Sequence, residues 1–221
     1  MTAATCKDWS ADDPAAVPLI VANIQALWPD IEAAASSRPP PTLDLILEWH
    51  RRIYAGVAVP EDQYVGQVRD SDERFPCLIG YEVSVGGVAG TPAREVPDAL
   101  GRFIGAATAV TGALDAAIPP GTVPSRHLDV AAIVRLCANA HGEWIRIHPF
   151  ANGNGRTARI LANWLAVRYG LPPFVRIKPR PDDLVFAGAA ALSMRGEYHA
   201  TEALFTGLLA QALAESFGRG F

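Results

Sequence analysis

Hydrophobic residues recur every three or four positions along most of this chain, which is the period of an amphipathic helix. The pattern predicts helices over residues 17–35, 42–54, 93–118, 128–143, 153–169, 182–194 and 198–217. Thr42 is expected to cap the second of them, and Pro29 is expected to interrupt the first, because proline lacks the N–H that a helix interior uses. The chain is therefore predicted to be mostly α-helical.

Residues 57–93 lack the helical period. Within them Tyr81, Val83 and Val85 alternate with polar residues, which is the pattern of a half-exposed strand, and Gly86-Gly87 follows as a turn signal. This segment predicts a small β-hairpin, the one β element of the expected fold.

The run Ser36–Pro41 breaks the helical pattern, and it divides an expected N-terminal extension (residues 1–41) from the main domain (residues 42–221). Residues 1–16 are polar and are expected to be frayed. No signal peptide and no membrane-length apolar stretch is recognised.

The three cysteines are Cys6, Cys77 and Cys137. They are odd in number, widely separated and unlike a metal-ligand set, so reduced thiols and a cytoplasmic location are expected.

The net charge of −4 opposes a general nucleic-acid binder, and no helix-turn-helix is recognised, so a DNA-binding regulator is disfavoured. Residues 146–180 are different, because they hold seven Arg or Lys and no Asp or Glu. This segment would attract a small polyanion even though the whole chain is acidic. Without a motif, the simpler interpretation would be a solvated basic face.

Twelve consecutive residues, from His148 to Arg159, combine the groups needed to hold phosphates beside a base. Gly153-Asn154-Gly155 stands at a predicted helix start, where backbone N–H groups and the helix dipole attract an anion. Arg156, Arg159 and Asn163 follow at spacings of three and four, so they share one helix face. Each guanidinium can bind a phosphate with two N–H groups. His148 titrates near neutrality and is suited to take a proton from a hydroxyl.

Each of these residues also has a structural interpretation. Lone helix arginines are usually solvated or in surface salt bridges, and a lone loop histidine usually bonds backbone. Their convergence in one run favours a site instead. Asn152 offers an uncharged oxygen ligand for Mg²⁺. His141 lies seven residues before His148, which fits no compact zinc site, and the other histidines are expected to be structural or exposed.

The run resembles the signature of the Fic family, His-x-Phe-x-(Asp/Glu)-Gly-Asn-Gly-Arg-x-x-Arg, at every fixed position except the acidic one. Residues 43–69, which end in Gly66-x-x-Arg69, resemble the family's first helix and turn. Residues 80–92 resemble its β-hairpin flap, and residues 93–215 resemble its helical core. The resemblance implies a Fic-type helical bundle that transfers a nucleotide monophosphate, usually AMP from ATP, onto a protein hydroxyl.

By position, the resemblance makes His148 the general base on a Ser, Thr or Tyr of a target protein. Asn152 would stand where the family has its acidic Mg²⁺ ligand. The flap, near Val83 and Val85, would clamp a segment of the target as an added strand.

The same resemblance makes Gly153-Asn154-Gly155 the anion hole for the α- and β-phosphates. Arg156 and Arg159 would hold the β- and γ-phosphates, and Asn163 would approach the nucleotide.

The departure at Asn152 removes a formal charge from the metal site, so weaker Mg²⁺ binding is expected. Two alternatives to AMP transfer stay open: a nucleotide-binding regulatory module with little or no catalysis, and transfer of a different nucleotide or phosphate group. An asparagine here also occurs in the Doc-type kinase branch, whose motif reads Ala-Asn-Lys, but Gly153 and Gly155 follow the AMP-transfer pattern.

Many family members carry an inhibitory helix with the motif Ser/Thr-x-x-x-Glu-Gly/Asn. Thr91 to Glu95 and Ser193 to Glu197 have the first spacing, but neither is followed by Gly or Asn. The expectation is therefore either no restraint of this kind or restraint by a separate small antitoxin-like protein. A toxin role is compatible with the resemblance.

Overall fold

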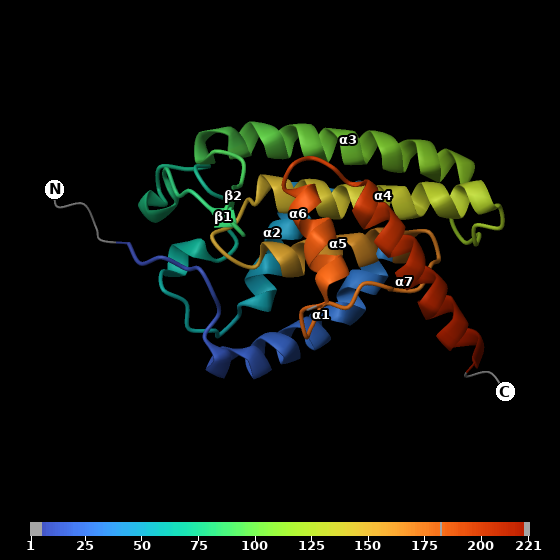
Figure 1. Cartoon of the computed structure of the whole chain (residues 1–221), viewed down its shortest axis with the longest axis horizontal. Helices are drawn as coiled ribbons and strands as arrows, with labels where there is room; N and C mark the ends of the chain where they lie inside the picture. The colour runs from blue at the N-terminus through green and yellow to red at the C-terminus, as the bar shows by residue number, and fades with distance from the viewer. Residues whose placement is uncertain (1–5, 182, 219–221) are drawn as a thin grey trace.

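The computed structural model describes residues 6–181 and 183–218 of the 221-residue chain. They form a helical bundle with one small hairpin (Figure 1). The elements are α1 (Val17–Ser37), α2 (Leu43–Ile53), β1 (Ser84–Val85), β2 (Val88–Ala89), α3 (Val96–Ala117), α4 (His127–Ile147), α5 (Asn154–Arg168), α6 (Leu184–Ser193) and α7 (His199–Gly218). The predicted mostly α fold with a β-hairpin is confirmed.

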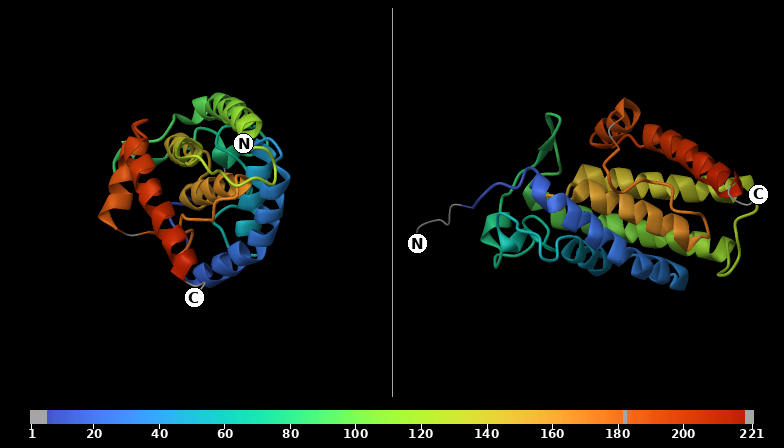
Figure 2. Two further views of the ribbon diagram at one scale, coloured as in Figure 1. Left: turned by 90° about the vertical axis from the view of Figure 1, so that its right-hand side faces the viewer. Right: turned by 90° about the horizontal axis from the view of Figure 1, so that it is seen from below.

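Helix α5 lies at the centre of the bundle. Seen end-on in Figure 2 (left), the other helices surround it, and α4 runs alongside it while α1 and α2 pack on another side. Helix α3 covers α4, and α6 and α7 pack on α4 from the opposite side. This arrangement surrounds the signature run, which connects α4 to α5, with protein on most sides.

The burial of α5 exceeds what its sequence suggests. Its apolar residues, such as Ile160 and Trp164, are fully buried, but Arg156, Arg159 and Asn163 are also at most 5% exposed. The shared polar face predicted from the spacing therefore points into the protein rather than into solvent. Buried charges need partners or a ligand, so this face must be accounted for group by group.

Helix α1 continues through Pro29, so the predicted interruption is wrong. Pro29 lies on the exposed side, whereas Ile24, Leu27 and Ile31 form a buried stripe on both sides of the proline. Packing of this stripe against α2 and α5 keeps the two halves in line. The next helix begins as expected, because the Thr42 side chain accepts a hydrogen bond from Leu45 N at 3.3 Å.

The hairpin is confirmed, with a shorter ladder than the alternating residues suggest. β1 and β2 are antiparallel and pair Ser84 with Ala89 and Val85 with Val88. The turn residues Gly86 and Gly87 have φ values of 57° and 79°, a left-handed conformation that glycine adopts without strain. The hairpin projects away from the helices (Figure 2, right).

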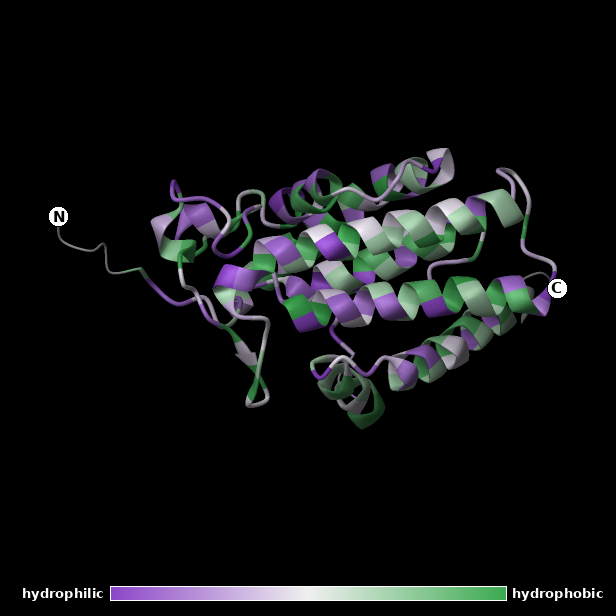
Figure 3. Cartoon of the chain, turned by 90° about the horizontal axis from the view of Figure 1, so that it is seen from above, coloured by the Kyte–Doolittle hydropathy of each residue, from purple (hydrophilic) through white to green (hydrophobic). Residues whose placement is uncertain are grey.

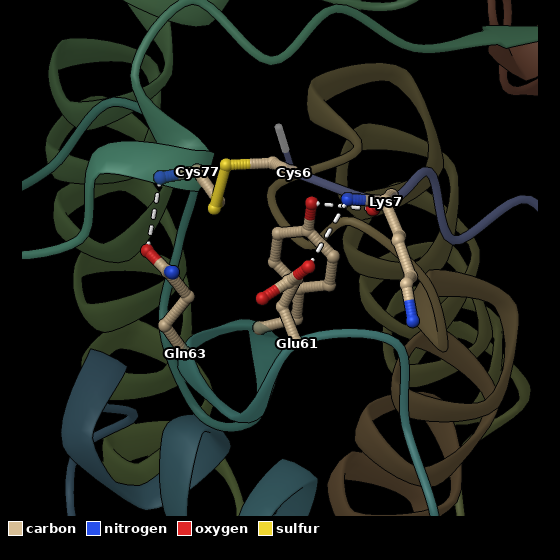
Figure 4. Close-up of a disulfide and its surroundings, with 6 residues drawn as sticks. Cys6, Lys7, Glu61, Gln63 and Cys77 are labelled. Atoms are coloured by element: carbon tan, nitrogen blue, oxygen red, sulfur yellow. Dashed lines mark hydrogen bonds between the residues drawn. A yellow bond between two sulfur atoms is a disulfide. The ribbon is translucent and has the colours of Figure 1, made fainter. Parts of the chain in front are cut away.

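Two expectations for the N-terminal segment are wrong. Residues 6–16 are not frayed, since Trp9 is 3% exposed and packs against Tyr54 and Tyr64. Cys6 and Cys77 are not free thiols, because they form a disulfide across 71 residues of sequence (Figure 4). The N-terminal segment folds back over the turn at Cys77. The spacing of the cysteines in the sequence does not predict this contact. The expected fraying of residues 1–5 lies outside the described residues.

Among the described residues, no helix combines the length and the hydrophobicity needed to cross a membrane. Figure 3 shows hydrophilic and hydrophobic residues mixed along the long helices.

Candidate active site

A cavity of about 640 Å³ opens where α4 ends and α5 begins. The hairpin and residues 8–12 form one side, and Lys178, Arg180 and α6 form another. The predicted residues His148, Asn152, Gly153-Asn154-Gly155, Arg156, Arg159, Val83 and Val85 all line it. A volume of this size suits a small organic ligand.

His148 is held in an unusual backbone conformation at the end of α4. Its φ is 53°, and its N–H closes the helix by donating to Trp144 O at 2.9 Å. The ring Nδ1 lies 3.0 Å from Ile145 O, so it must carry a proton to donate to that carbonyl. Nε2 is then the nitrogen with a lone pair. Burial lowers the pKa of His148 to about 4, so this lone pair is available at neutral pH.

The arginine of the Gly66-x-x-Arg69 motif fixes both His148 and the flap. Arg69 is completely buried, and it donates to His148 O at 2.8 Å and Ile147 O at 3.1 Å. It also donates to Tyr81 O at 2.7 Å and Thr91 O at 2.9 Å, which lie at the two ends of the flap. The sequence marks Arg69 as part of a motif but does not indicate these four carbonyl partners.

The loop between the helices is closed by its own side chains. Asn154 accepts from Phe150 N and donates to Phe150 O, both at 2.9 Å, so its side chain fixes the loop rather than facing a ligand. His50 lies beneath the loop that connects α4 to α5. Gly66 N donates to His50 Nδ1 at 2.9 Å, so the proton on Nε2 is directed to Asn152 O at 3.0 Å. His50 is thus a buried structural histidine, as expected.

Gly153 needs to be glycine for both conformation and space. Its φ is 85°, and a Cβ there would lie 2.9 Å from Tyr54 Oη and 3.0 Å from His50 Nε2. The first four N–H groups of a helix have no partner inside it. Here those of Arg156 and Thr157 return to Gly153 O at 3.1 Å, and Asn154 and Gly155 line the cavity at the positive end of the α5 dipole.

Positive charge is concentrated at the inner wall. Arg159 is 4% exposed, and one terminal nitrogen donates to Ile177 O at 3.2 Å, while its buried Nε has no partner among the described residues. Burial, together with the charges of Arg156, Arg180 and Arg176, lowers the pKa of Arg159 to about 9. Arg156 and Arg159 are buried, whereas Arg176 and Arg180 are exposed. A buried guanidinium among like charges is costly without an anion, so Arg159 indicates an anion site.

Two groups differ from the sequence interpretation. Asn163 is absent from the cavity wall, because its side chain bonds the backbone of Phe174 and Val175 at 2.7–3.0 Å. It fixes a loop instead of approaching a ligand. Arg156 is in the wall, but its terminal nitrogens already donate to the Asp12 carboxylate and to Tyr54 Oη. Nothing in the sequence indicates that Asp12 belongs to the site, because it lies in the segment that is expected to be frayed.

Sequence comparison identifies the family. The Fic/DOC family model matches residues 40–166. The chain belongs to the Fic/DOC family. A protein adenylyltransferase Fic from Drosophila erecta is 45% identical over 51 residues, which are 23% of this chain and 10% of that protein. The chain thus aligns with about a tenth of the length of such curated relatives.

Solved structures share the fold of this Fic/DOC protein. A Fic domain-containing signaling protein from Bacteroides thetaiotaomicron matches 93% of the chain and 71% of its own length, with a TM-score of 0.58 and 20% identity. Fic-1 from C. elegans matches 90% of this chain and 49% of its own, with a TM-score of 0.60 and 17% identity.

The Fic/DOC model begins at residue 40, so Trp9 and Asp12 lie outside it although they line the cavity. Within the described residues no group of three or more His, Cys, Asp or Glu is placed to hold a metal. A divalent cation bound together with a nucleotide would take oxygen ligands, such as those of the phosphates.

Proposed function

We propose that this protein transfers AMP from ATP to a hydroxyl group of a protein Ser, Thr or Tyr, with Mg²⁺ as the cofactor. The observation that carries the proposal is the placement of His148 Nε2 in one cavity with the α5 N-terminus and with Arg159, which has no carboxylate partner among the described residues. A base, an anion site and a cationic wall are the groups that this reaction needs.

In the proposed reaction, His148 Nε2 accepts the proton of the target hydroxyl as its oxygen attacks the α-phosphorus of ATP. A new phosphorus–oxygen bond forms, the bond to the β-phosphate oxygen breaks, and pyrophosphate leaves. The N–H groups at the start of α5 stabilise charge on the phosphates, and Arg159 holds the terminal phosphate. Arg69 keeps His148 aligned through its backbone.

Mg²⁺ would neutralise phosphate charge and bind beside Asn152, whose Oδ1 accepts from Gly153 N at 2.6 Å at the cavity edge. The target chain would pair with the flap. In the described residues the sheet has two strands, which leaves each strand an unpaired edge. An added strand on that edge would bring a hydroxyl toward His148 through backbone bonds that read little sequence.

The test is labelling of a lysate with ATP labelled at the α- or the γ-phosphate. Label from the α-position should enter protein, and His148→Ala should abolish it because no base remains. His127→Ala is the matched control, since His127 is exposed at the start of α4 and outside the cavity. Transfer from the γ-position would show a kinase and contradict the proposal.

A second candidate is a nucleotide-binding regulatory module with little or no transfer. Asn152 at the acidic position and the engagement of Arg156 by Asp12 favour it. It predicts ATP binding that weakens on Arg159→Gln, with no label transferred to protein from α-labelled ATP. Restraint by a separate small antitoxin-like protein is compatible with either candidate.

A further inference from the structure

A carboxylate from outside the signature run reaches the place where the run lacks one. Asp12 Oδ1 accepts hydrogen bonds from Asn152 Nδ2 at 3.1 Å, Arg156 Nη2 at 3.0 Å and Tyr54 Oη at 3.2 Å. Its Oδ2 accepts from Arg156 Nη1 alone among the described residues. Asp12 also lines the cavity.

Asp12, rather than residue 152, supplies the carboxylate that pairs with Arg156. Asn152 lies in the loop before α5, four residues ahead of Arg156. Asn152 makes only a 3.5 Å contact from its Oδ1 to Arg156 Nη2. Arg156 is 5% exposed and needs a negative partner, and Asp12 supplies it.

The position of Asp12 is fixed by several contacts of the segment 6–12, called here the N-terminal strap. The Cys6–Cys77 disulfide holds one end (Figure 4). Tyr64 Oη donates to Lys7 O at 2.7 Å, and Trp9 N donates to Tyr81 Oη at 3.0 Å. With Trp9 buried, the strap is a wall of the site rather than a loose end lying over it.

We propose that Asp12 is the acidic residue of this site, and that its Oδ2 contacts the divalent cation that accompanies a bound nucleotide. Mg²⁺ sites of this kind use one or two carboxylates plus substrate phosphates, which fits a cavity without a three-residue metal cluster. Asn152 then positions Asp12 through its amide. The inference rests on the proposed nucleotide site and adds a residue that lies outside the Fic/DOC match.

If Asp12 acted against nucleotide binding, its removal would change the nucleotide affinity in the opposite direction. If Asp12 only covered Arg156, it would compete with the phosphates, and its removal would tighten nucleotide binding with or without metal. If Asp12 contacts the cation, its removal weakens binding of the metal–nucleotide complex and spares metal-free nucleotide.

Calorimetric titration of the full chain with ATP, once with Mg²⁺ and once with EDTA, separates these roles. The affinity gain from Mg²⁺ in the wild type should fall about tenfold or more in Asp12→Asn. The double variant Asp12→Asn, Asn152→Asp should restore it, because the carboxylate returns to the signature position. Asp13→Asn is the matched control, since Asp13 is the exposed neighbour, lies outside the cavity lining, and its side chain accepts a hydrogen bond from Ala15 N at 2.9 Å.

Equal or tighter Mg²⁺–ATP binding by Asp12→Asn would overturn the inference. The unfolding curve of that variant shows whether it folds. If it does not fold, an NMR experiment on the wild-type protein with Mn²⁺–ATP tests the inference. The bound Mn²⁺ should broaden the NMR carboxyl signal of Asp12 strongly and that of the surface residue Asp98 little; equal broadening overturns the inference. If ATP does not bind in either titration, the proposed function fails; if ATP binds with an Asp12-independent Mg²⁺ effect, only this inference fails.

Discussion

Single side chains set the proton state of the candidate base. His148 Nδ1 is committed to Ile145 O, so only Nε2 can accept a proton from a substrate. Burial keeps the ring neutral well below its ordinary pKa of 6.5. A base of this kind is always in its reactive form at neutral pH, although it is a weaker base than a solvated histidine.

The pH dependence of the proposed AMP transfer follows from this proton state. The kcat/KM of the free enzyme should stay level from pH 8 to about pH 5 and then fall toward pH 4, because the pKa of His148 is about 4. Initial rates against pH would measure this, with circular dichroism at each pH to confirm folding. A decline centred near pH 6.5 would mean that His148 titrates as an exposed histidine.

Arg159 should show opposite effects on stability and on binding. It is buried among positive charges with no carboxylate partner among the described residues, so Arg159→Met removes an unfavourable charge. The melting temperature is expected to hold or rise, while ATP affinity falls about tenfold or more for loss of a charge-assisted phosphate contact. Thermal unfolding and calorimetry measure the two effects. A large loss of stability would instead assign Arg159 a structural role.

At the scale of elements, side-chain hydrogen bonds, rather than helix packing, fix the flap and the signature loop. The β1–β2 ladder is only two residues long in each strand, too short to be stable alone. Arg69 joins both flap ends to the end of α4, and His50 joins α2 to the loop. The buried guanidinium of Arg69 therefore helps to fix the flap relative to the base, together with the bond from Thr91 N to Arg146 O at 3.2 Å.

Replacement of Arg69 tests this connection. Arg69→Met should lower the free energy of unfolding by about 3–5 kcal/mol, because it leaves buried carbonyl oxygens without donors. Urea denaturation would measure it. Arg51→Met is a suitable control, since Arg51 is exposed and pairs with Glu48 on the same helix, so its cost should stay below about 1 kcal/mol. Equal costs for the two variants would contradict the role given to Arg69.

At the scale of the whole molecule, the buried His50 and His141 and the half-buried His148 couple folding to pH. Burial lowers the pKa of His50 and His141 to about 3 and that of His148 to about 4. An unfolded chain, in which histidine has a pKa near 6.5, binds more protons between these values. Stability is therefore full above pH 6.5 and is lost as the pH falls through this window.

Acid unfolding should accordingly be steep. With about three protons taken up on unfolding near pH 5, the free energy of unfolding should change by roughly 4 kcal/mol per pH unit. Urea midpoints at pH 5, 6 and 7 would measure the slope. Replacement of His141 by Asn, which does not titrate, should reduce the slope by about a third; an unchanged slope would mean that His141 is not buried in its neutral form.

The local pattern was sufficient for the helices, the hairpin and the signature run. Apolar periodicity placed α2 through α7 to within a few residues, and Gly86-Gly87 located the turn. The run from His148 to Arg159 is contiguous, so its members had to meet in space once a loop and a helix start were recognised. These features depend on neighbours within a few positions, which a sequence displays directly.

What only the tertiary structure decided are the contacts between distant segments. Asp12 meets Arg156 across 144 positions, Cys6 meets Cys77 across 71, and Arg69 meets His148 O across 79. Most of α5 is buried because α1, α2 and α4 pack against it. This packing directs Asn163 to a loop and Arg156 to Asp12. Periodicity reports which face of a segment is apolar, but the partner that covers a polar face is chosen by the global packing, because no local preference encodes it.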